Sequence, residues 1–340
     1  MKIVFFDVDK LTGQYLAARP ACKCDIMLLE NSIETVTPEQ YKQIKDADVI
    51  SVFVHSSELM GEKLLAPYQS LKLIATRSTG FDHIDLEYCK KRGIAVENVP
   101  RYGEATVAEY AMGLLLNVSR RIITARNDMS DGIYKIKHYT GFDLYGRTIG
   151  IIGTGAIGRH MIKLAKGFGM NVLAYDLYPN EEFKRIYNIN YVSLEELYAG
   201  SDIISLHAPS TKENYHLLND KSFAKMKDGV IIINTARGDL IDAEDLYKNI
   251  LSGKVGGAGL DVLEDEDFII HDDIIMEEED RNISLAMNTI ANNKLLKHKH
   301  VIVTPHIAFN SIDAVYRILD TTLKNIENFV GGKVVNSVIK

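Results

Sequence analysis

Short apolar runs rich in β-branched residues alternate with longer segments of helical periodicity along most of the chain. Four such runs predict a first set of strands, at 2–6, 48–54, 71–76 and 93–98. Six more runs predict a second set, at 148–153, 171–176, 202–209, 229–236, 256–262 and 300–305. Strands that alternate with helices indicate crossover connections and parallel sheets. The pattern therefore predicts an α/β fold with two doubly wound parallel sheets, each in a domain of its own.

One amphipathic helix is predicted between the two sets of strands, and a second after the last strand. One is predicted at 103–126 and the other at 311–330, because apolar residues recur there at helical spacing. No strand of the second set follows the last helix, so we expect it to return to the first domain. The predicted domains are 1–101 together with 309–340, and 102–308 between them. Two chain crossings of this kind form a hinge over a cleft, which suits closure on a ligand.

Composition narrows the class of protein. A chain of 340 residues is long enough for two domains, and its formal net charge of −7 leaves no basic stripe for nucleic acid. The three cysteines, Cys22, Cys24 and Cys89, and the histidines show no metal-ligand spacing, so we expect no metal and reduced thiols. No export leader follows Met1, and no apolar run approaches the roughly 20 residues that cross a bilayer. These features predict a cytoplasmic protein without membrane contact.

A glycine motif stands between a predicted strand and a predicted helix. The run TIGIIGTGAIG (148–158) places Gly153, Gly155 and Gly158 in the order GxGxxG. The first glycine permits a tight turn, and the second lets the backbone approach a pyrophosphate. The third lets the helix pack closely on the strand, so that the helix N-terminus faces the phosphate charge. The motif predicts a dinucleotide site, whereas a turn that only packs an α/β unit is the alternative.

Asp176 ends the next predicted strand and bears on which nucleotide binds. A carboxylate at this place can accept hydrogen bonds from the adenosine ribose diol, and it would repel a 2′-phosphate. The nearest bases further along the chain, Lys184 and Arg185, lie several residues on. The sequence therefore favours NAD over NADP.

Four ionisable residues follow strands of the second set: Arg237, Asp261, Glu266 and His306. Ligands of open α/β sheets bind beyond the carboxyl ends of the strands, so we expect these side chains at one sheet edge. An arginine offers a planar fork to a carboxylate, and a histidine exchanges protons near neutral pH. A carboxylate bonded to that histidine would raise its pKa and keep it protonated. Together they predict hydride-transfer chemistry.

Each of these residues also has a simpler interpretation. Arg237 could be a surface arginine at a helix start, His306 a loop histidine, and Asp261 the cap of a turn. Glu266 lies at the start of a strongly acidic stretch, 265–283, which is typical of a solvated surface loop. Their common placement after strands of one sheet favours a shared site over these separate roles. His207, after another strand, is a rival proton donor, although its place favours lining the path of the cofactor.

The small residues Ser78, Thr79 and Gly80 follow a strand of the first set. Such a turn presents backbone N–H groups that suit a substrate carboxylate, which Arg237 would hold from the other side. An ordinary strand-to-helix turn is the alternative.

The chain resembles the D-2-hydroxyacid dehydrogenases, and within that family most the fermentative NAD-dependent D-lactate dehydrogenases. The resemblance runs nearly end to end and includes the segments TRSTGFDHIDLEYCKKRGI, VPRYGEATVAEY, GFDLYGRTIGIIGTGAIG, ENYHLLND, MKDGVIIINTARGDLID, GLDVLEDE and VTPHIAF. It implies a Rossmann-type cofactor domain, a flavodoxin-like substrate domain, a cleft between them, and a homodimer or larger homo-oligomer that associates through the 103–126 region.

The resemblance also implies residue roles. Arg237 would bind and polarise the 2-oxo acid, His306 would be the acid/base, and Glu266 would pair with it. The implied cofactor contacts are Val107, Gly153, Gly155, Ala156, Ile157, Gly158, Asp176, His207, Ala208, Pro209, Asn214, Thr235, Ala236, Arg237 and Asp261. The implied substrate contacts are Ser78, Thr79, Gly80, Tyr102, Arg237, His306 and Phe309.

Three departures from the family pattern bear on the substrate. Gly103-Glu104 stands where relatives usually have Ser-Pro or Asp-Pro after the tyrosine, Asn310 stands where an aromatic residue is frequent, and His55 where some have Tyr or Asn. The expected reaction is reduction of a small 2-oxo acid by NADH, with pyruvate as first candidate and D-lactate as product. The alternatives are a bulkier 2-oxo acid, such as 2-oxoglutarate or a branched-chain acid, and an NAD(H)-sensing corepressor-like protein.

Overall fold

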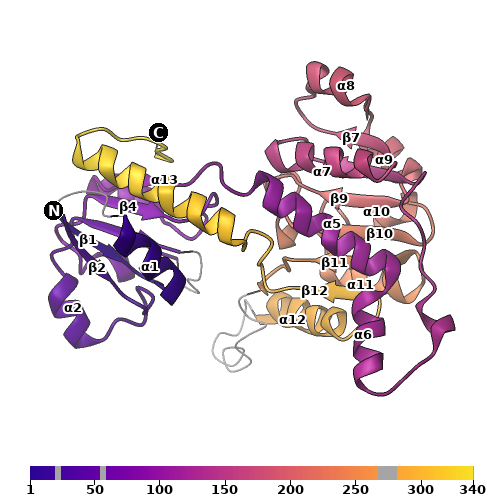
Figure 1. Ribbon diagram of the computed structural model, residues 1–340, viewed down its shortest axis with the longest axis horizontal. Coiled ribbons are helices and arrows are strands. Elements are labelled where there is room, and N and C mark those ends of the chain that lie inside the picture. The colour runs from indigo at the N-terminus through magenta and orange to yellow at the C-terminus, as the bar shows by residue number, and fades with distance from the viewer. Residues whose placement is uncertain (20–23, 54–58, 267–281, 340) are drawn as a thin grey trace. The chain divides into compact units, whose positions relative to one another are not determined.

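The computed structural model describes residues 1–19, 24–53, 59–266 and 282–339. The chain forms two compact units (Figure 1). The first unit comprises Met1–Tyr102 and Asn310–Lys340, and the second comprises Gly103–Phe309. Both boundaries fall one residue after the boundary expected from the sequence. His55 lies outside the described residues.

The first unit has a five-stranded sheet in the order β2-β1-β3-β4-β5, and every neighbouring pair is parallel. The strands are β1 (Lys2–Phe5), β2 (Asp25–Leu28), β3 (Val49–Val52), β4 (Leu73–Thr76) and β5 (Ala95–Glu97). The helices are α1 (Lys10–Ala18), α2 (Pro38–Ile44), α3 (Glu62–Leu65), α4 (Leu86–Arg92) and α13 (Ile312–Val330). Helix α13 packs on this sheet, where Leu319, Leu323 and Ile326 join the core around Ile3 and Phe5.

The second unit has a seven-stranded parallel sheet in the order β12-β11-β10-β9-β6-β7-β8. Its strands are β6 (Thr148–Ile152), β7 (Asn171–Tyr175), β8 (Asn190–Tyr191), β9 (Ile203–Leu206), β10 (Val230–Asn234), β11 (Val255–Leu260) and β12 (Val301–Val303). The predicted α/β class with two parallel sheets is confirmed. Two strands were not predicted, β2 and β8. They are short edge strands whose side chains are not fully buried, so neither shows a long apolar run.

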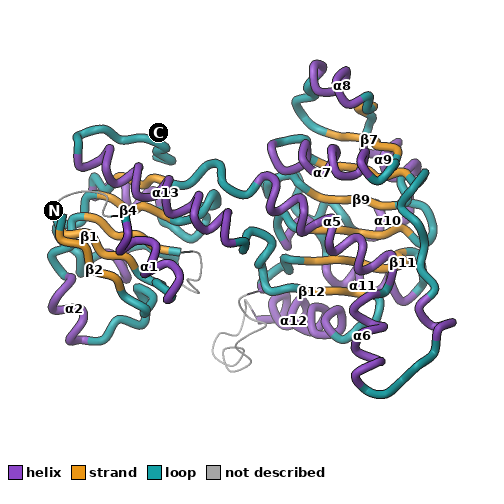
Figure 2. The backbone as a smooth tube through the Cα atoms, viewed as in Figure 1, coloured by secondary structure: helices purple, strands orange, loops and turns teal. Residues whose placement is uncertain are grey.

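Helices cover both faces of the second sheet (Figure 2). They are α5 (Glu104–Arg120), α6 (Ile122–Ser130), α7 (Ala156–Gly167), α8 (Glu181–Tyr187), α9 (Leu194–Gly200), α10 (Asp220–Lys225), α11 (Ala243–Leu251) and α12 (Asn282–Leu296), with short 3₁₀ turns η1 (Ile136–Tyr139) and η2 (Gly238–Leu240). Helices α5 and α7 contribute to one core, whereas α9, α10, α11 and α12 contribute to the other. Burial on both faces explains why the central strands β9 and β10 are mostly apolar along their whole length.

The prediction of a single helix at 103–126 is wrong, because the helix is interrupted at Arg121, between α5 and α6. Arg121 adopts a left-handed conformation, with φ 54°. The carbonyl oxygen of Ser119 accepts a hydrogen bond from the N–H of Phe142 at 3.0 Å, so a distant segment occupies an acceptor that a continuous helix would use. Helix α6 buries none of its residues. The implied subunit association through this region stays a prediction.

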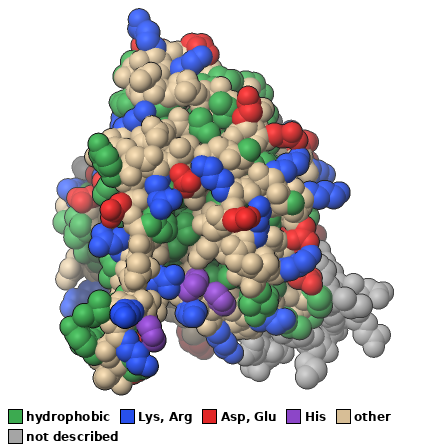
Figure 3. Space-filling view, turned by 90° about the vertical axis from the view of Figure 1, so that its right-hand side faces the viewer, with side chains coloured by type: hydrophobic (Ala, Val, Ile, Leu, Met, Phe, Trp, Pro, Cys, Tyr) green, Lys and Arg blue, Asp and Glu red, His purple; other side chains and the backbone are tan. Residues whose placement is uncertain are grey.

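The surface of the second unit carries mixed charges and some apolar side chains. Basic and acidic side chains are interspersed over the face drawn in Figure 3. In and after α6 several large apolar side chains are exposed: Ile122, Ile123, Met129, Ile133, Tyr134 and Ile136. No helix among the described residues has the length and apolar character needed to span a membrane. The same residues contain no cluster of three or more metal-binding side chains.

The prediction of three reduced thiols needs one correction. Cys24 is disulfide-bonded. An odd number of cysteines does not exclude one such pair. Cys89 is a free, buried thiol, and burial raises its pKa to about 11. Cys22 lies outside the described residues.

Truncation of the α13 core contact should destabilise the first unit. Leu319 is 1% exposed, so Leu319→Ala removes buried methyl groups and should lower the free energy of unfolding by about 2–5 kcal/mol. Urea unfolding followed by circular dichroism measures the change. Ile312→Ala is the matched control, since that side chain is 53% exposed and its loss should cost no more than about 0.5 kcal/mol. Equal effects of the two variants would contradict the packing of α13 on this sheet.

Candidate active site

The glycine-rich turn connects β6 to α7 and shows a separate physical reason for each glycine. Gly153 has a φ of 90°, and a Cβ there would lie 2.7 Å from the backbone N of Ala208. A Cβ on Gly158 would lie 2.0 Å from the carbonyl oxygen of Gly153, so the helix can approach the strand only without a side chain. A Cβ on Gly155 would meet nothing within 4 Å. The turn thus leaves open space at the N-terminus of α7, where a pyrophosphate would lie.

Asp176 follows β7 and is oriented by its own neighbourhood. Its Oδ2 accepts hydrogen bonds from the N–H and the hydroxyl of Thr154, at 2.6 and 2.8 Å, and its Oδ1 accepts from the N–H of Tyr178 at 2.8 Å. Partial burial opposes ionisation, but these bonds outweigh it and hold the pKa of Asp176 below its usual range. The charge of Arg159 on α7 acts in the same direction. The carboxylate is therefore ionised and fixed in place.

His306 and Glu266 form a direct pair in the second unit. The Nδ1 atom of His306 lies 2.6 Å from Oε1 of Glu266. Desolvation opposes the charged imidazolium, but the Glu266 hydrogen bond and the charges of Glu266 and Asp261 outweigh it, so the pKa of His306 is raised. The charge of Arg237 acts against this rise, which places that guanidinium in the same electrostatic neighbourhood. The protonated imidazole therefore persists to a higher pH than for an ordinary histidine.

Asp261 holds the loop that carries His306. Its carboxylate accepts hydrogen bonds from the hydroxyl of Thr304 at 2.5 Å and from the N–H groups of Ile307 and Ala308 at 3.0 and 2.7 Å. The residue is fully buried, and burial raises its pKa despite these bonds. The N–H of His306 donates to the carbonyl oxygen of Asp261 at 2.9 Å. The implied contact of Asp261 with the cofactor stays a prediction.

Arg237 follows β10 on a loop that packs against the loop of Glu266. The side chain of Asn234 ties this loop, accepting from the N–H of Ala236 and donating to the carbonyl oxygen of Arg237. A Cβ on Gly238 would lie 2.0 Å from the carbonyl carbon of Leu263, so the two loops touch backbone to backbone. Arg237, Glu266 and His306 thus occupy connected loops beyond the carboxyl ends of β10, β11 and β12.

His207 does not suit the role of rival proton donor. The residue is partly buried, its Nε2 lies 2.9 Å from the hydroxyl of Ser205, and desolvation of the ring lowers its pKa to about 4. It is therefore neutral at physiological pH. Its Nδ1 and the hydroxyl of Thr235 are buried and have no hydrogen-bond partner among the described atoms. Two such polar groups after β9 and β10 fit a ligand that would supply partners.

The other implied cofactor residues lie on the same unit. Asn214 closes the turn after β9, accepting from the N–H of Thr211 and donating to the carbonyl oxygen of Pro209. Val107 is buried on α5. Ala156 and Ile157 begin α7, which places them at the glycine-rich turn.

The implied substrate residues of the first unit form a hydrogen-bonded turn. The hydroxyl of Ser78 donates to the carbonyl oxygen of Gly80 at 2.6 Å, and that of Thr79 donates to Val99 at 2.8 Å. The carbonyl oxygen of Tyr102 accepts from the Arg317 guanidinium at 2.7 Å. Phe309 is the last residue of the second unit. The substrate contacts of these residues stay predictions.

Several residues of this region were not predicted from the sequence. Tyr215, His216 and Glu264 form a polar cluster beside the Glu266 loop, and Asn292 on α12 donates to the carbonyl oxygen of Glu264. The segment ENYHLLND was visible in the sequence, but its histidine meets Glu264 only through a long-range contact. Thr154 and Arg159, beside Asp176, were missed for the same reason.

Several known proteins are similar to this chain over most of its length. Residues 112–308 match the family model for the D-isomer specific 2-hydroxyacid dehydrogenase NAD-binding domain. A D-lactate dehydrogenase of Escherichia coli is 38% identical over 88% of this chain and 88% of its own length. An aromatic 2-oxoacid reductase of Clostridium sporogenes is 40% identical over 76% of both chains. The structure of an Aquifex aeolicus D-lactate dehydrogenase complexed with NAD and lactic acid matches with a TM-score of 0.82, 34% identity and 99% of both chains.

Loss of the Glu266 carboxylate should lower the pKa of His306. The hydrogen bond and negative charge of Glu266 favour the imidazolium, so Glu266→Gln removes the larger of the interactions that raise this pKa. The titration of His306, followed by NMR of histidine-labelled protein without substrate, should move to lower pH. Glu244→Gln, which changes an acid of α11, is the control. An unchanged midpoint in Glu266→Gln would mean that the pair does not form in solution.

Proposed function

Because this chain belongs to the D-isomer specific 2-hydroxyacid dehydrogenase family, we propose that it reduces a small 2-oxo acid with NADH, with pyruvate as the first candidate and D-lactate as the product. The observation that carries the proposal is the distance of 2.6 Å between Nδ1 of His306 and Oε1 of Glu266. The loop of Glu266 also packs against the loop of Arg237. A proton donor with a raised pKa and a guanidinium in its electrostatic neighbourhood form the combination that reduction of a 2-oxo acid requires.

His306 acts as the proton donor in this proposal. Reduction of a ketone places negative charge on the carbonyl oxygen, and an imidazolium neutralises that charge by transferring its Nε2 proton. Glu266 accepts from Nδ1, which fixes the orientation of the ring and stabilises its charged form. In the reverse direction the neutral ring accepts the proton of the hydroxyl group.

Arg237 binds the substrate in this proposal. Its planar guanidinium donates two parallel hydrogen bonds to a carboxylate and can also polarise the neighbouring carbonyl oxygen. The Asn234 bonds that tie the 234–237 loop limit the positions that the guanidinium can reach. Preorganised donors of this kind stabilise developing negative charge without a reorganisation step.

The residues present fit NAD. Gly153, Gly155 and the N-terminus of α7 would hold the pyrophosphate, and Asp176 would accept from the ribose hydroxyls. Thr235 and His207 supply the buried polar atoms that lack protein partners. The nicotinamide, when bound, supplies the hydride.

A bulkier 2-oxo acid is the second candidate substrate. The similarity to a relative named as an aromatic 2-oxoacid reductase, at 40% identity, favours it as an alternative to pyruvate. Both candidates share the carboxylate and the carbonyl group that Arg237 and His306 would engage, so they differ only in the third substituent.

A panel of 2-oxo acids tests the proposed function. Purified protein should oxidise NADH, followed by its absorbance, with pyruvate as the best substrate and D-lactate as the product by chiral chromatography. A higher kcat/KM with phenylpyruvate or 2-oxoglutarate would support the second candidate instead. NADH binding without oxidation by any acid of the panel would indicate a binding protein such as a corepressor.

Removal of the imidazole should slow the chemical step. His306→Ala should lower kcat for reduction by about 10² to 10⁴-fold, the range for loss of a general acid, while the Kd for NADH measured by fluorescence changes little. His138→Ala, which removes an exposed histidine of the same unit, is the control. In the wild-type protein, reduction should be fastest below the raised pKa of His306 and should fall as pH increases through it. Full activity of His306→Ala would exclude this histidine from the mechanism.

A further inference from the structure

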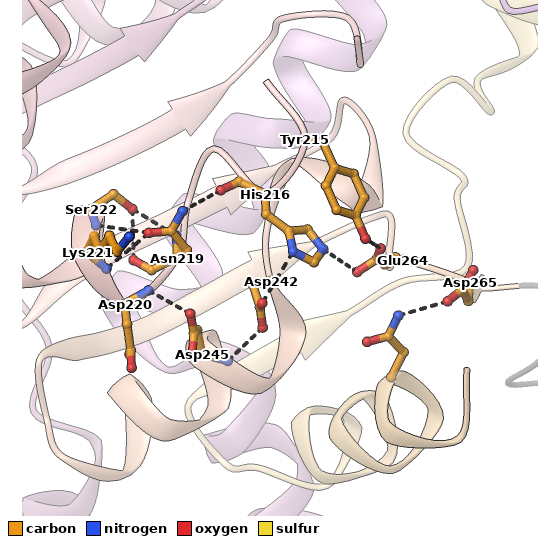
Figure 4. Close-up of polar contacts among 11 residues, drawn as sticks. Tyr215, His216, Asn219, Asp220, Lys221, Ser222, Asp242, Asp245, Glu264 and Asp265 are labelled. Atoms are coloured by element: carbon orange, nitrogen blue, oxygen red, sulfur yellow. Dashed lines mark hydrogen bonds and ion pairs between the residues drawn. The ribbon is translucent and has the colours of Figure 1, made fainter. Parts of the chain in front are cut away.

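A second polar cluster surrounds Glu264, two residues before Glu266 in the chain (Figure 4). The carboxylate of Glu264 is nearly buried, and each of its oxygens has a partner. Oε1 accepts from the hydroxyl of Tyr215 at 2.7 Å, and Oε2 lies 2.8 Å from Nε2 of His216. The Tyr215 and His216 rings stack with their centroids 3.9 Å apart. Two side chains from a loop distant in sequence, Tyr215 and His216, therefore bind the Glu264 carboxylate.

The loop that carries Tyr215 and His216 is itself held in place. Nδ1 of His216 lies 3.3 Å from Oδ2 of Asp242, the N-cap residue of α11. The N–H of His216 donates to Asp239, and its carbonyl oxygen accepts from the side chain of Asn219. His216 has a φ of 49°, a conformation that a non-glycine residue keeps only where its surroundings hold it. Contacts from two helix starts and from the Arg237 loop thus fix the histidine.

Glu264 and Glu266 belong to one short turn. Oε2 of Glu266 accepts from the backbone N–H of Leu263 at 3.1 Å, so the orientation of the Glu266 carboxylate depends on the 263–264 backbone. The carbonyl oxygen of Glu264 accepts from the side chain of Asn292, which is fully buried. Gly238 lies against the preceding peptide, between Leu263 and Glu264. A displacement of Glu264 would therefore turn the carboxylate that pairs with His306.

We propose that Glu264, held by Tyr215 and His216, is a positioning residue that sets Glu266 against His306. This inference rests on the proposed function for its kinetic consequence. The charged groups around the cluster are Asp239, Asp242, Asp265 and Glu266, so a carboxylate at 264 stands among other acids. The hydroxyl of Tyr215 and the imidazole of His216 fix the direction of this carboxylate. Burial and the negative charge of Glu264 also raise the pKa of Tyr215, which keeps its hydroxyl a donor.

Two variants and a control test the proposal. Glu264→Gln keeps the shape of the side chain but removes its charge, and Tyr215→Phe removes one hydroxyl from a half-exposed ring. Tyr145→Phe is the matched control, because Tyr145 belongs to the same unit and is 82% exposed. His306 titration is followed by NMR in the substrate-free protein, and kcat/KM for 2-oxo acid reduction, the Kd for NADH and the melting temperature are measured alongside.

We expect both variants to move the His306 titration to lower pH. Their kcat/KM should fall by about 10- to 100-fold, while NADH affinity stays within about twofold of wild type. In a Glu266→Gln background, Glu264→Gln should move the titration no further, because it acts through Glu266. A lower melting temperature with an unchanged His306 titration would overturn the proposal and leave Glu264 a purely structural residue. Should Glu264→Gln fail to fold, Tyr215→Phe decides by the same measurements.

The readouts separate the two proposals. A wild-type protein that turns over no 2-oxo acid would contradict the proposed function, yet the NMR titration would still report whether Glu264 positions Glu266. A protein with normal turnover and an unchanged titration in both variants would contradict only the positioning role.

Discussion

The buried carboxylate of Asp261 organises the candidate active site at the carboxyl end of the second sheet. Removal of a carboxylate from water costs several kcal/mol, and three hydrogen bonds from the 304–308 loop offset this cost. Bonds to a charged group contribute about 1.5–3 kcal/mol each, which is enough to hold a loop in one conformation. His306 lies within this loop with a φ of 51°, so the direction of its ring follows from the bonds that Asp261 makes.

Close backbone approach is the second constraint, and it connects loops that belong to different strands. Gly153 brings the loop after β6 against the loop after β9, and Gly238 brings the Arg237 loop against the Glu266 loop. A side chain at either position would force backbone atoms apart. The candidate active site therefore depends on contacts between loops as much as on the ends of the strands, and the ionisable groups keep their relative positions because the loops cannot move separately.

The sequence predicted the fold class where burial leaves a strong pattern. Central strands such as β9 and β10 are covered on both faces and are buried at every position, whereas the edge strands β2 and β8 are not. The break at Arg121 was missed, because the Phe142 N–H that takes the Ser119 carbonyl is distant in sequence. The alternation of sheet and helix placed Arg237, Glu266 and His306 after their strands. His216 and Glu264 are 48 residues apart in the sequence, so no local sequence pattern predicts their contact.

The chemistry of the site and the choice of substrate have different physical origins. His306 and Arg237 would meet a carbonyl oxygen and a carboxylate, which every 2-oxo acid possesses. Their arrangement therefore determines which reaction is possible, but it does not select the third substituent of the substrate. This accounts for a family whose similar members carry names as different as D-lactate dehydrogenase and aromatic 2-oxoacid reductase. Selectivity must come from side chains that touch that substituent, and these can change without altering the bonds that Asp261, Glu264 and Glu266 make.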